Sequence, residues 1–313
     1  MAKDRPLVAI VGPTAVGKTE IALQLGERLD AELVSADSRL LYRGMDIGTA
    51  KPSLADLARV PHHLIDVADP DETWSLAVFQ RAAAEAISQI HQRGRLPILV
   101  GGTGQYLRAI LEGWAPPKLA PQPRLRAALA AWAAELGNEQ IHSRLAALDP
   151  AAAGHIDPRN VRRTLRALEV TLASGRRFSE QRGHKPAPYR VLQIGLMRPR
   201  AELYARIDVR IQAMLAAGWV NEVKALLAKG YEPSLPSLSA IGYAQLNEYL
   251  RGKLTLEQAV AEIKQKTRLF VRRQAAWFKP GDARIHWFDA GSPRVVEEVE
   301  KAVNSFLSAK NIH

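Results

Sequence analysis

The chain has 313 residues, of which 47% are hydrophobic and 24% charged, the balance of a soluble globular protein with one large domain or two. It has no cysteine, no apolar stretch of membrane-spanning length and no secretory leader, which excludes disulfides, thiolate zinc sites and cysteine nucleophiles and predicts a cytoplasmic protein without membrane contact. The formal net charge of +11 favours a partner with many phosphates, and a basic surface that only aids solubility is the alternative.

The first predicted elements are a strand, a loop and a helix. Residues 7–11 form an apolar run of strand length, and Ile21, Leu25 and Leu29 recur at helical spacing. The loop between them reads GPTAVGKT and fits the pattern of a polyphosphate-binding loop, in which backbone N–H groups, a lysine and a hydroxyl for Mg²⁺ surround the anion. The predicted phosphate-binding residues are Gly12, Pro13, Thr14, Ala15, Val16, Gly17, Lys18 and Thr19, with Thr19 as the metal-binding residue.

A parallel sheet is predicted from the alternation that follows. Residues 32–35 and 96–100 are two further strands, and 76–90 carries apolar residues at helical spacing. Ligands bind beyond the carboxyl ends of such strands, where Asp37, Ser38 and Thr103 join the phosphate loop. The expected fold class is therefore α/β, a P-loop NTPase-like parallel sheet covered by helices.

Three features near this edge have competing interpretations. A carboxylate at Asp37 either takes a proton from an acceptor nucleophile or forms a turn or helix cap, and its place after a strand beside the phosphate loop favours the first. The polar segment 42–52 is typical of a loop that closes over substrate, and its Lys51 either reaches a phosphate or is solvated. The cluster of His62, His63 and Asp66 resembles a metal site, but a structural role is favoured.

An inserted helical domain is predicted after the proline-rich boundary at residues 114–123. Two apolar stripes follow, Leu125, Leu129, Trp132 and Leu136, then Val161, Leu165, Leu168 and Leu172, with Arg162, Arg163 and Arg166 opposite the second. A second break precedes residues 191–196, which read as a strand returning to the sheet. The predicted division is a core of 1–115 and 190–313, with a helical C-terminal part, and an insert of 116–189.

The C-terminal part contains a basic helix. Lys264, Arg268 and Arg272 recur every four residues, while Ile263, Phe270 and Trp277 recur every seven and are expected to pack. Because no acidic residue stands between Lys264 and Lys279, the stripe favours a polyanion-binding face over a solvated one.

Seven segments together resemble the bacterial type of the tRNA dimethylallyltransferase (tRNA isopentenyltransferase) family. They run in order over nearly the whole chain, and the IGTAKP stretch at 47–52 and the last, arginine-rich segment are specific to the family, whereas the phosphate loop is not. The segments are GPTAVGKT at 12–19, DSRLLYRGMDIGTAKP at 37–52, HHLID at 62–66, GGTGQYL at 101–107, DPRNVRRTLRALEV at 157–170, IGYAQL at 241–246 and TRLFVRRQAAWF at 267–278.

The resemblance implies transfer of a dimethylallyl group from its diphosphate to the exocyclic amine of the adenosine immediately 3′ of the anticodon. The phosphate loop and Mg²⁺ would then hold the diphosphate leaving group rather than ATP, Asp37 would act as base, and Thr103 and Lys18 would complete the catalytic set. It implies tRNA and dimethylallyl diphosphate as partners. Since no obligatory protein partner is evident in the sequence, a monomer is expected. The implied tRNA contacts are Asp37, Ser38, Arg39, Leu40, Thr103, Arg126, Val161, Arg162, Arg163, Thr164, Leu165, Arg272, Arg273, Gln274 and Lys279, with 239–244 also along the tRNA path.

Three other functions share part of this pattern. A small-molecule kinase using ATP shares the loop, Asp37 and the sheet, but does not need the arginine-rich segments. A prenyltransferase of free adenine nucleotides shares the core chemistry, so the basic segments discriminate against it. A non-enzymatic RNA-binding module is disfavoured by the intact Gly17-Lys18-Thr19 and Asp37.

Overall fold

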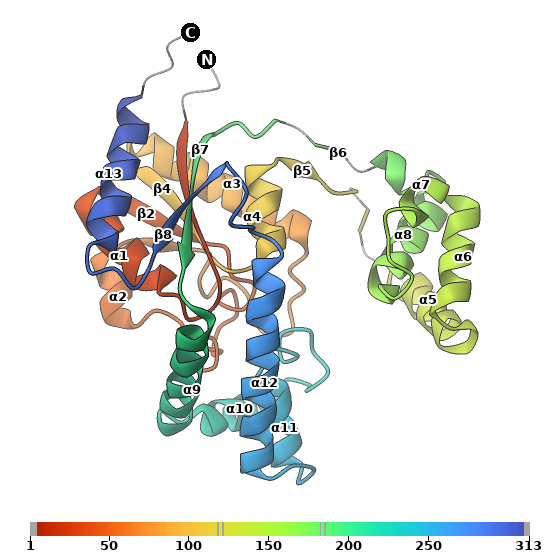
Figure 1. The fold of residues 1–313 in the computed structure, drawn as a ribbon. Helices are drawn as coiled ribbons and strands as arrows, with labels where there is room; N and C mark the ends of the chain where they lie inside the picture. The colour runs from red at the N-terminus through yellow and green to blue at the C-terminus, as the bar shows by residue number, and fades with distance from the viewer. Residues whose placement is uncertain (1–4, 118, 121, 182, 185, 310–313) are drawn as a thin grey trace. The chain divides into compact units, whose positions relative to one another are not determined.

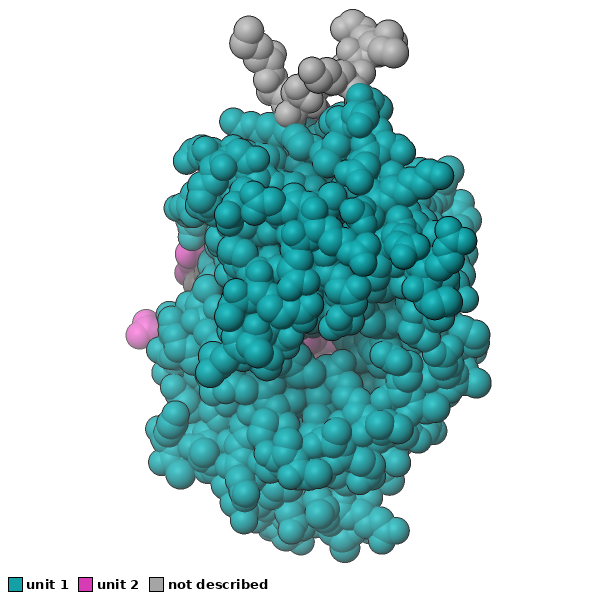
Figure 2. Space-filling view, turned by 90° about the vertical axis from the view of Figure 1, so that its left-hand side faces the viewer, with its two compact units in different colours: residues 1–111, 187–313 teal, residues 112–186 magenta. Residues whose placement is uncertain are grey.

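The computed structural model describes residues 5–117, 119–120, 122–181, 183–184 and 186–309. They form two compact units, which we call unit 1 (residues 1–111 and 187–313) and unit 2 (residues 112–186) (Figure 2). Each unit has its own hydrophobic core. None of the described helices combines the length and apolarity needed to cross a membrane.

Unit 1 is built on a six-stranded parallel sheet with the order β3-β2-β4-β1-β7-β8. The central strand β1 is buried from Leu7 to Val11 because β4 and β7 pair with its two edges and helices cover both faces of the sheet (Figure 1). This explains why its sequence is continuously apolar instead of alternating. The predicted return of residues 191–196 to the sheet is confirmed. The strands are β1 (Pro6–Val11), β2 (Ala31–Ser35), β3 (His62–His63), β4 (Leu96–Val100), β7 (Arg190–Met197) and β8 (Ile285–Asp289).

Helices cover both faces of this sheet and extend past its carboxyl edge. Figure 1 shows α1 and α13 on one face, α3 and α4 on the other, and α9 to α12 beyond the carboxyl ends of the strands. The α/β fold class with a P-loop-like core is confirmed. The helices are α1 (Lys18–Arg28), α2 (Leu54–Arg59), α3 (Leu76–Gln92), α4 (Gly104–Leu111), α9 (Arg200–Ala216), α10 (Trp219–Ala228), α11 (Tyr243–Leu250), α12 (Leu256–Ala275) and α13 (Val295–Ser308).

Unit 2 is helical apart from one short antiparallel pair, β5 with β6. Its core includes Leu129, Ile141, Leu145, Leu168 and Phe178. Asn160 caps α8 by accepting a hydrogen bond from the Arg163 N–H. Its elements are β5 (Trp114–Ala115), α5 (Pro123–Leu136), α6 (Asn138–Leu148), α7 (Pro150–Ala153), α8 (Val161–Ser174), the 3₁₀ turn η1 (Ser179–Gln181) and β6 (Gly183–His184).

The predicted packing stripes are partly wrong. Trp132 and Leu172 are 50% and 48% exposed, whereas the smaller Ala133 and Ala167 are buried. In α12, Phe270 is 38% exposed and its neighbour Val271 is buried. The prediction followed the largest apolar side chains. In the structure, neighbouring alanine and valine side chains are the buried ones, so each buried face is displaced by about one residue from the predicted stripe.

Candidate active site

The phosphate loop, residues 12–19, joins β1 to α1 with backbone geometry that requires glycine at two positions. Gly12 has φ +151°, and a Cβ there would lie 2.7 Å from the Leu196 carbonyl oxygen. Gly17 has φ +111° and stands at the N-cap of α1, so no side chain caps that helix. The first N–H groups of α1 therefore have no helical or capping partner, which is the arrangement that binds an anion.

Lys18 lies inside this loop. Its Nζ donates to the carbonyl oxygens of Gly12 at 3.0 Å and Pro13 at 2.8 Å, which leaves one of its three donors for an anion. Burial lowers the pKa of Lys18 to about 8, with Asp37 opposing the shift and Arg210 adding to it. A buried cation at this position is stabilised by a negatively charged ligand.

Asp37 and Thr103 follow neighbouring strands and meet at the same edge of the sheet. Asp37 Oδ1 accepts a hydrogen bond from the Arg39 N–H at 2.9 Å. Thr103 Oγ1 accepts from the Ser38 N–H at 3.1 Å, while the Thr103 N–H donates to the Ala36 carbonyl at 3.3 Å. The segment after β2 is thereby fixed to the turn after β4, with both side chains half-buried.

Helix α9 supplies arginines that sequence reasoning missed. Arg206 Nε donates to the Ala15 carbonyl at 2.8 Å, and Arg198, just before the helix, donates to the Val16 carbonyl at 3.1 Å. Arg210 lies near Asp37 and Lys18, and its pKa is lowered by burial and raised by Asp37. The detectable signal was the spacing of Arg206 and Arg210, four residues apart on one helix face. Among the described residues, Asp37 is the carboxylate that acts on both Lys18 and Arg210, so these three groups together carry a net positive charge.

The segment 42–52, expected to close over substrate, is held in place. Glu222 accepts hydrogen bonds from the N–H groups of Asp46, Ile47 and Gly48 at 2.8, 2.6 and 3.2 Å. The side chain of Lys51 is only 5% exposed and pairs with Asp46 at 2.5 Å and with Asp66. Both interpretations of Lys51 were therefore wrong, because it neutralises carboxylates within the loop.

The two histidines after this loop have protein partners. His63 Nε2 lies 2.6 Å from a Glu32 carboxylate oxygen, and His62 Nδ1 lies 2.7 Å from the Val60 carbonyl. Asp66 forms an ion pair with Lys51. Among the described residues no group of three or more histidines and carboxylates is arranged to hold a metal.

The predicted basic stripe of α12 divides into two parts. Arg268 pairs with Asp208 of α9 at 2.7 Å, and Lys264 lies 3.9 Å from the same carboxylate. A carboxylate distant in sequence therefore pairs with Arg268 and lies near Lys264, which corrects the expectation that Arg268 faces a polyanion. Arg272 and Arg273 on the last turn, and Lys279 after it, are exposed.

Two other predicted tRNA contacts in unit 1 face inward. The Arg39 guanidinium donates to the Pro236 and Ser237 carbonyl oxygens at 2.7 and 3.1 Å, which fixes the loop before α11. Gln274 is buried, with its amide between the phosphate loop and the turn after β4. The half-buried Leu40 accepts a hydrogen bond from the Asp66 N–H through its carbonyl oxygen.

In unit 2 the predicted contacts are of three kinds. Arg162 and Arg163 are exposed on the first turn of α8. Val161 and Leu165 pack against the unit 2 core. Thr164 is wholly buried, so its side chain is not presented to a partner, contrary to the prediction.

A buried carboxylate in unit 2 holds two further arginines. Glu169, with no exposed surface, accepts from Arg126 at 2.9 Å and from Arg166 at 2.9 Å. Arg166 therefore does not lie with the exposed arginines, as its position opposite the apolar stripe suggested. Arg126 is half-exposed, and this ion pair fixes its guanidinium.

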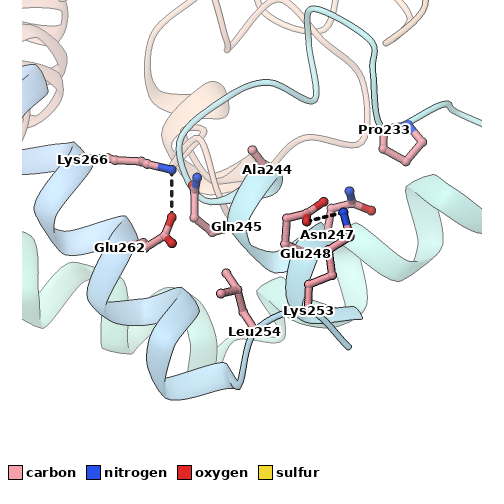
Figure 3. Close-up of a pocket in the computed structure, with 9 residues that line it drawn as sticks. All are labelled: Pro233, Ala244, Gln245, Asn247, Glu248, Lys253, Leu254, Glu262 and Lys266. Atoms are coloured by element: carbon pink, nitrogen blue, oxygen red, sulfur yellow. Dashed lines mark hydrogen bonds and ion pairs between the residues drawn. The ribbon is translucent and has the colours of Figure 1, made fainter. Parts of the chain in front are cut away.

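A separate pocket of about 380 Å³ lies where α11 meets α12 (Figure 3). Its two lysines are paired within it, Lys253 with Glu248 and Lys266 with Glu262, both at 2.9 Å. Balanced charge makes this pocket a poor match for a diphosphate, so the chemistry is assigned to the phosphate loop. Pro233, Ala244, Gln245, Asn247 and Leu254 complete the lining.

Comparisons with known proteins agree with one another. Residues 40–281 match the family model described as IPP transferase. The chain is 56% identical over 274 residues to a tRNA dimethylallyltransferase of Roseiflexus sp. (strain RS-1), covering 88% of this chain and 90% of the relative. It is similar to the crystal structure of the full-length tRNA isopentenylpyrophosphate transferase from Bacillus halodurans, with TM-score 0.73, 40% identity and 97% coverage of each chain.

A third comparison concerns a structure of a eukaryotic dimethylallyltransferase acting on tRNA. It has TM-score 0.81 and 26% identity, and the match covers 98% of this chain and 81% of that one. The chain shares extensive identity with the first two proteins, and the family model matches most of its length. The chain therefore belongs to the IPP transferase family.

Proposed function

We propose that this protein transfers a dimethylallyl group from dimethylallyl diphosphate to the exocyclic amine of an adenosine in tRNA, the one immediately 3′ of the anticodon, and releases diphosphate. Membership of the IPP transferase family and the names of its relatives support the reaction class. The carrying observation is the phosphate loop, where Lys18 Nζ contacts the Gly12 and Pro13 carbonyl oxygens and where, among the described residues, Asp37 is the carboxylate that acts on both Lys18 and Arg210. The net positive charge of these three groups suits a diphosphate.

Each residue has a role in the proposed displacement. The adenine nitrogen forms a bond to the first carbon of the dimethylallyl group as the bond from that carbon to diphosphate oxygen breaks. Diphosphate leaves with the electron pair, and its developing charge is stabilised by Lys18, Arg210 and the N–H groups of the loop. Asp37 accepts a hydrogen bond from the attacking amine and takes its proton, while Thr103, fixed beside Ser38, contacts both amine and diphosphate.

Mg²⁺ fits this site through the substrate. Mg²⁺ is commonly held by one or two protein oxygens together with phosphate oxygens and water, so it needs no cluster of carboxylates. Thr19, exposed on the first turn of α1, would supply the protein oxygen. When bound, the ion adds positive charge to the leaving diphosphate.

The exposed arginines of each unit are the proposed contacts to tRNA phosphates. Unit 1 offers Arg272 and Arg273 at the end of α12, and unit 2 offers Arg162 and Arg163 at the start of α8. An enzyme of a free nucleotide would need neither pair, so the basic surfaces favour tRNA as the acceptor.

The test is mass analysis of tRNA after incubation with dimethylallyl diphosphate and Mg²⁺. A prenyl increment on the adenosine next to the anticodon is expected, with none when AMP replaces tRNA as acceptor. Parallel arms contain ATP with candidate acceptors, and calorimetry compares ATP with dimethylallyl diphosphate. Phosphoryl transfer from tightly bound ATP would establish the kinase alternative and refute the proposal.

A further inference from the structure

A single amide connects the two halves of the proposed reaction centre. Gln274, on the last turn of α12, is 6% exposed. Its Oε1 accepts a hydrogen bond from the Thr14 N–H in the phosphate loop at 2.8 Å, and its Nε2 donates to the Gly102 carbonyl at 3.0 Å. Gly102 immediately precedes Thr103, so the amide spans from the diphosphate side to the amine side.

The Gln274 amide packs closely against Gly102. A Cβ on Gly102 would lie 2.4 Å from Gln274 Nε2 and 3.7 Å from Lys18 Nζ. Trp277, one turn further, packs against Gly104, and its carbonyl accepts from Arg108 at 2.7 Å. The end of α12 is thus held to helix α4, and Gln274 extends that attachment to the turn after β4 and to the phosphate loop.

The chemistry of the two partners selects a carboxamide. A backbone N–H requires an acceptor and a carbonyl requires a donor, and a carboxamide presents both on one planar group. Ionised glutamate only accepts and methionine, of similar length, offers no strong hydrogen bond. The two partners also fix which end of the Gln274 amide is oxygen.

We propose that Gln274 is a positioning residue that sets the phosphate loop relative to Thr103, and therefore the leaving diphosphate relative to the attacking amine. This rests on the proposed function and assigns Gln274 a role different from a tRNA contact. By holding the Thr14 N–H, Gln274 stabilises one loop conformation, in which the start of α1 is available to the anion. Misplacement of reacting groups by about 1 Å costs about a hundredfold in rate.

The test compares Gln274→Met and Gln274→Glu with Gln265→Met, the same change at an exposed position of α12. Calorimetry with inorganic pyrophosphate and Mg²⁺ should show affinity at least about fivefold weaker in Gln274→Met, and weaker still in Gln274→Glu, whose charge opposes the anion. Single-turnover prenylation at saturating tRNA should fall by about ten- to a hundredfold, with tRNA affinity changed by less than about threefold. Gln265→Met should match the wild type in all three measurements.

Three results would overturn the proposal. Pyrophosphate affinity and rate equal to the wild type in Gln274→Met would remove the positioning role. Weaker tRNA binding with an unchanged single-turnover rate would make Gln274 a tRNA contact. A lower melting temperature as the only change would make it a packing residue.

Two further arrangements keep the test decisive. If Gln274→Met does not fold, Gly102→Ala displaces the amide from the opposite side and should weaken pyrophosphate binding in the same way. If the wild type prenylates no tRNA, the proposed function fails by itself. The pyrophosphate measurements then still decide whether Gln274 organises the phosphate loop.

Discussion

The charge at the phosphate loop depends on a few side chains that come from different segments of the chain. Lys18 comes from the loop, Asp37 from the end of β2 and Arg210 from the middle of α9. Carbonyl oxygens of the loop are engaged by Lys18, Arg198 and Arg206, which reduces their repulsion of an anion. The site is therefore organised for negative charge before any ligand binds.

Removing the carboxylate of Asp37 separates chemistry from binding. With Asp37→Ala we expect turnover to fall by about 10²–10⁴-fold, because the proton of the attacking amine loses its acceptor. tRNA affinity should stay close to the wild type, since the proposed phosphate contacts lie elsewhere. Single-turnover kinetics and filter binding measure both quantities. Near-normal turnover would exclude Asp37 from the mechanism.

The protonation state of Lys18 predicts that kcat/KM declines in alkaline solution. Burial lowers the pKa of Lys18 to about 8, so the free enzyme loses this cation as the pH rises through that value. We expect kcat/KM for dimethylallyl diphosphate to fall by about tenfold per pH unit above pH 8. Bound diphosphate favours the charged amine, so the fall in kcat should begin at a higher pH.

A matched variant isolates this effect. Lys18→Arg keeps its charge throughout the range, because the guanidinium stays protonated to about pH 12 and beyond. Its kcat/KM should be lower at neutral pH but should not decline between about pH 8 and pH 10. The same alkaline decline in both proteins would assign it to another group.

Helix α12 shows how one element serves two purposes along its length. Its first turns are capped by Thr255 and Gln258, and its middle is paired to α9 through Arg268 and Asp208. Its last turn carries the buried Gln274 and the exposed Arg272 and Arg273. A regular four-residue repeat of basic residues therefore has a structural part and a surface part.

Two arginines of this repeat should respond differently to substitution. Arg272→Ala should flatten the slope of log tRNA affinity against log salt by about 0.7–0.9, because one phosphate contact and its counterion release are lost. The affinity for tRNAs of different sequence should fall by similar factors, since phosphates carry no sequence information. Affinity titrations at several salt concentrations measure this.

Arg268→Ala is the control within the same helix. It removes the partner of Asp208, so it should lower the melting temperature and leave the salt slope unchanged. An unchanged slope in Arg272→Ala would mean that the end of α12 is a solvated face. The net charge of +11 would then need another explanation.

The molecule as a whole contains two cores with separate sources of stability. Unit 1 is centred on its parallel sheet, whereas unit 2 has a smaller helical core with a buried ion-pair network around Glu169. Burial alone would raise the pKa of Glu169, but the Gln122 N–H, Arg126 and Arg166 together lower it. At pH values above the ordinary pKa range of glutamate, the charged carboxylate therefore stabilises unit 2. This stabilisation is lost as the pH falls through the lowered pKa of Glu169.

Neutralising this carboxylate should destabilise one unit and spare the other. We expect Glu169→Gln to cost unit 2 about 3 kcal/mol, because two arginines lose their shared buried partner. Hydrogen exchange should show faster opening of α5 and α8, with pyrophosphate binding by unit 1 unchanged. Glu135→Gln, on the exposed face of α5, is the matched control. Equal protection in both variants would show that the network does not hold unit 2 together.

Much of the fold followed from patterns that are local in the chain. The continuous apolar run of β1, the helical spacing after it and the glycines of the loop determined a strand, a phosphate loop and a helix. Because the carboxyl ends of parallel strands meet at one edge, the sequence also predicted that Asp37 and Thr103 would approach that loop. These inferences depend only on residues a few positions apart and on the handedness of βαβ connections.

Tertiary structure alone decided the partners of charged and polar side chains. Asp208 neutralises Arg268 and Glu222 holds the N–H groups of residues 46–48, across about 60 and 175 positions of chain. Gln274 reaches Thr14 across 260 positions. Such pairings depend on how whole elements pack, and a hydrogen-bonding side chain has the same local sequence signature whether it faces solvent, another helix or a ligand. The sequence by itself therefore determined the type and place of the site, while packing decided which polar residues are available to act there.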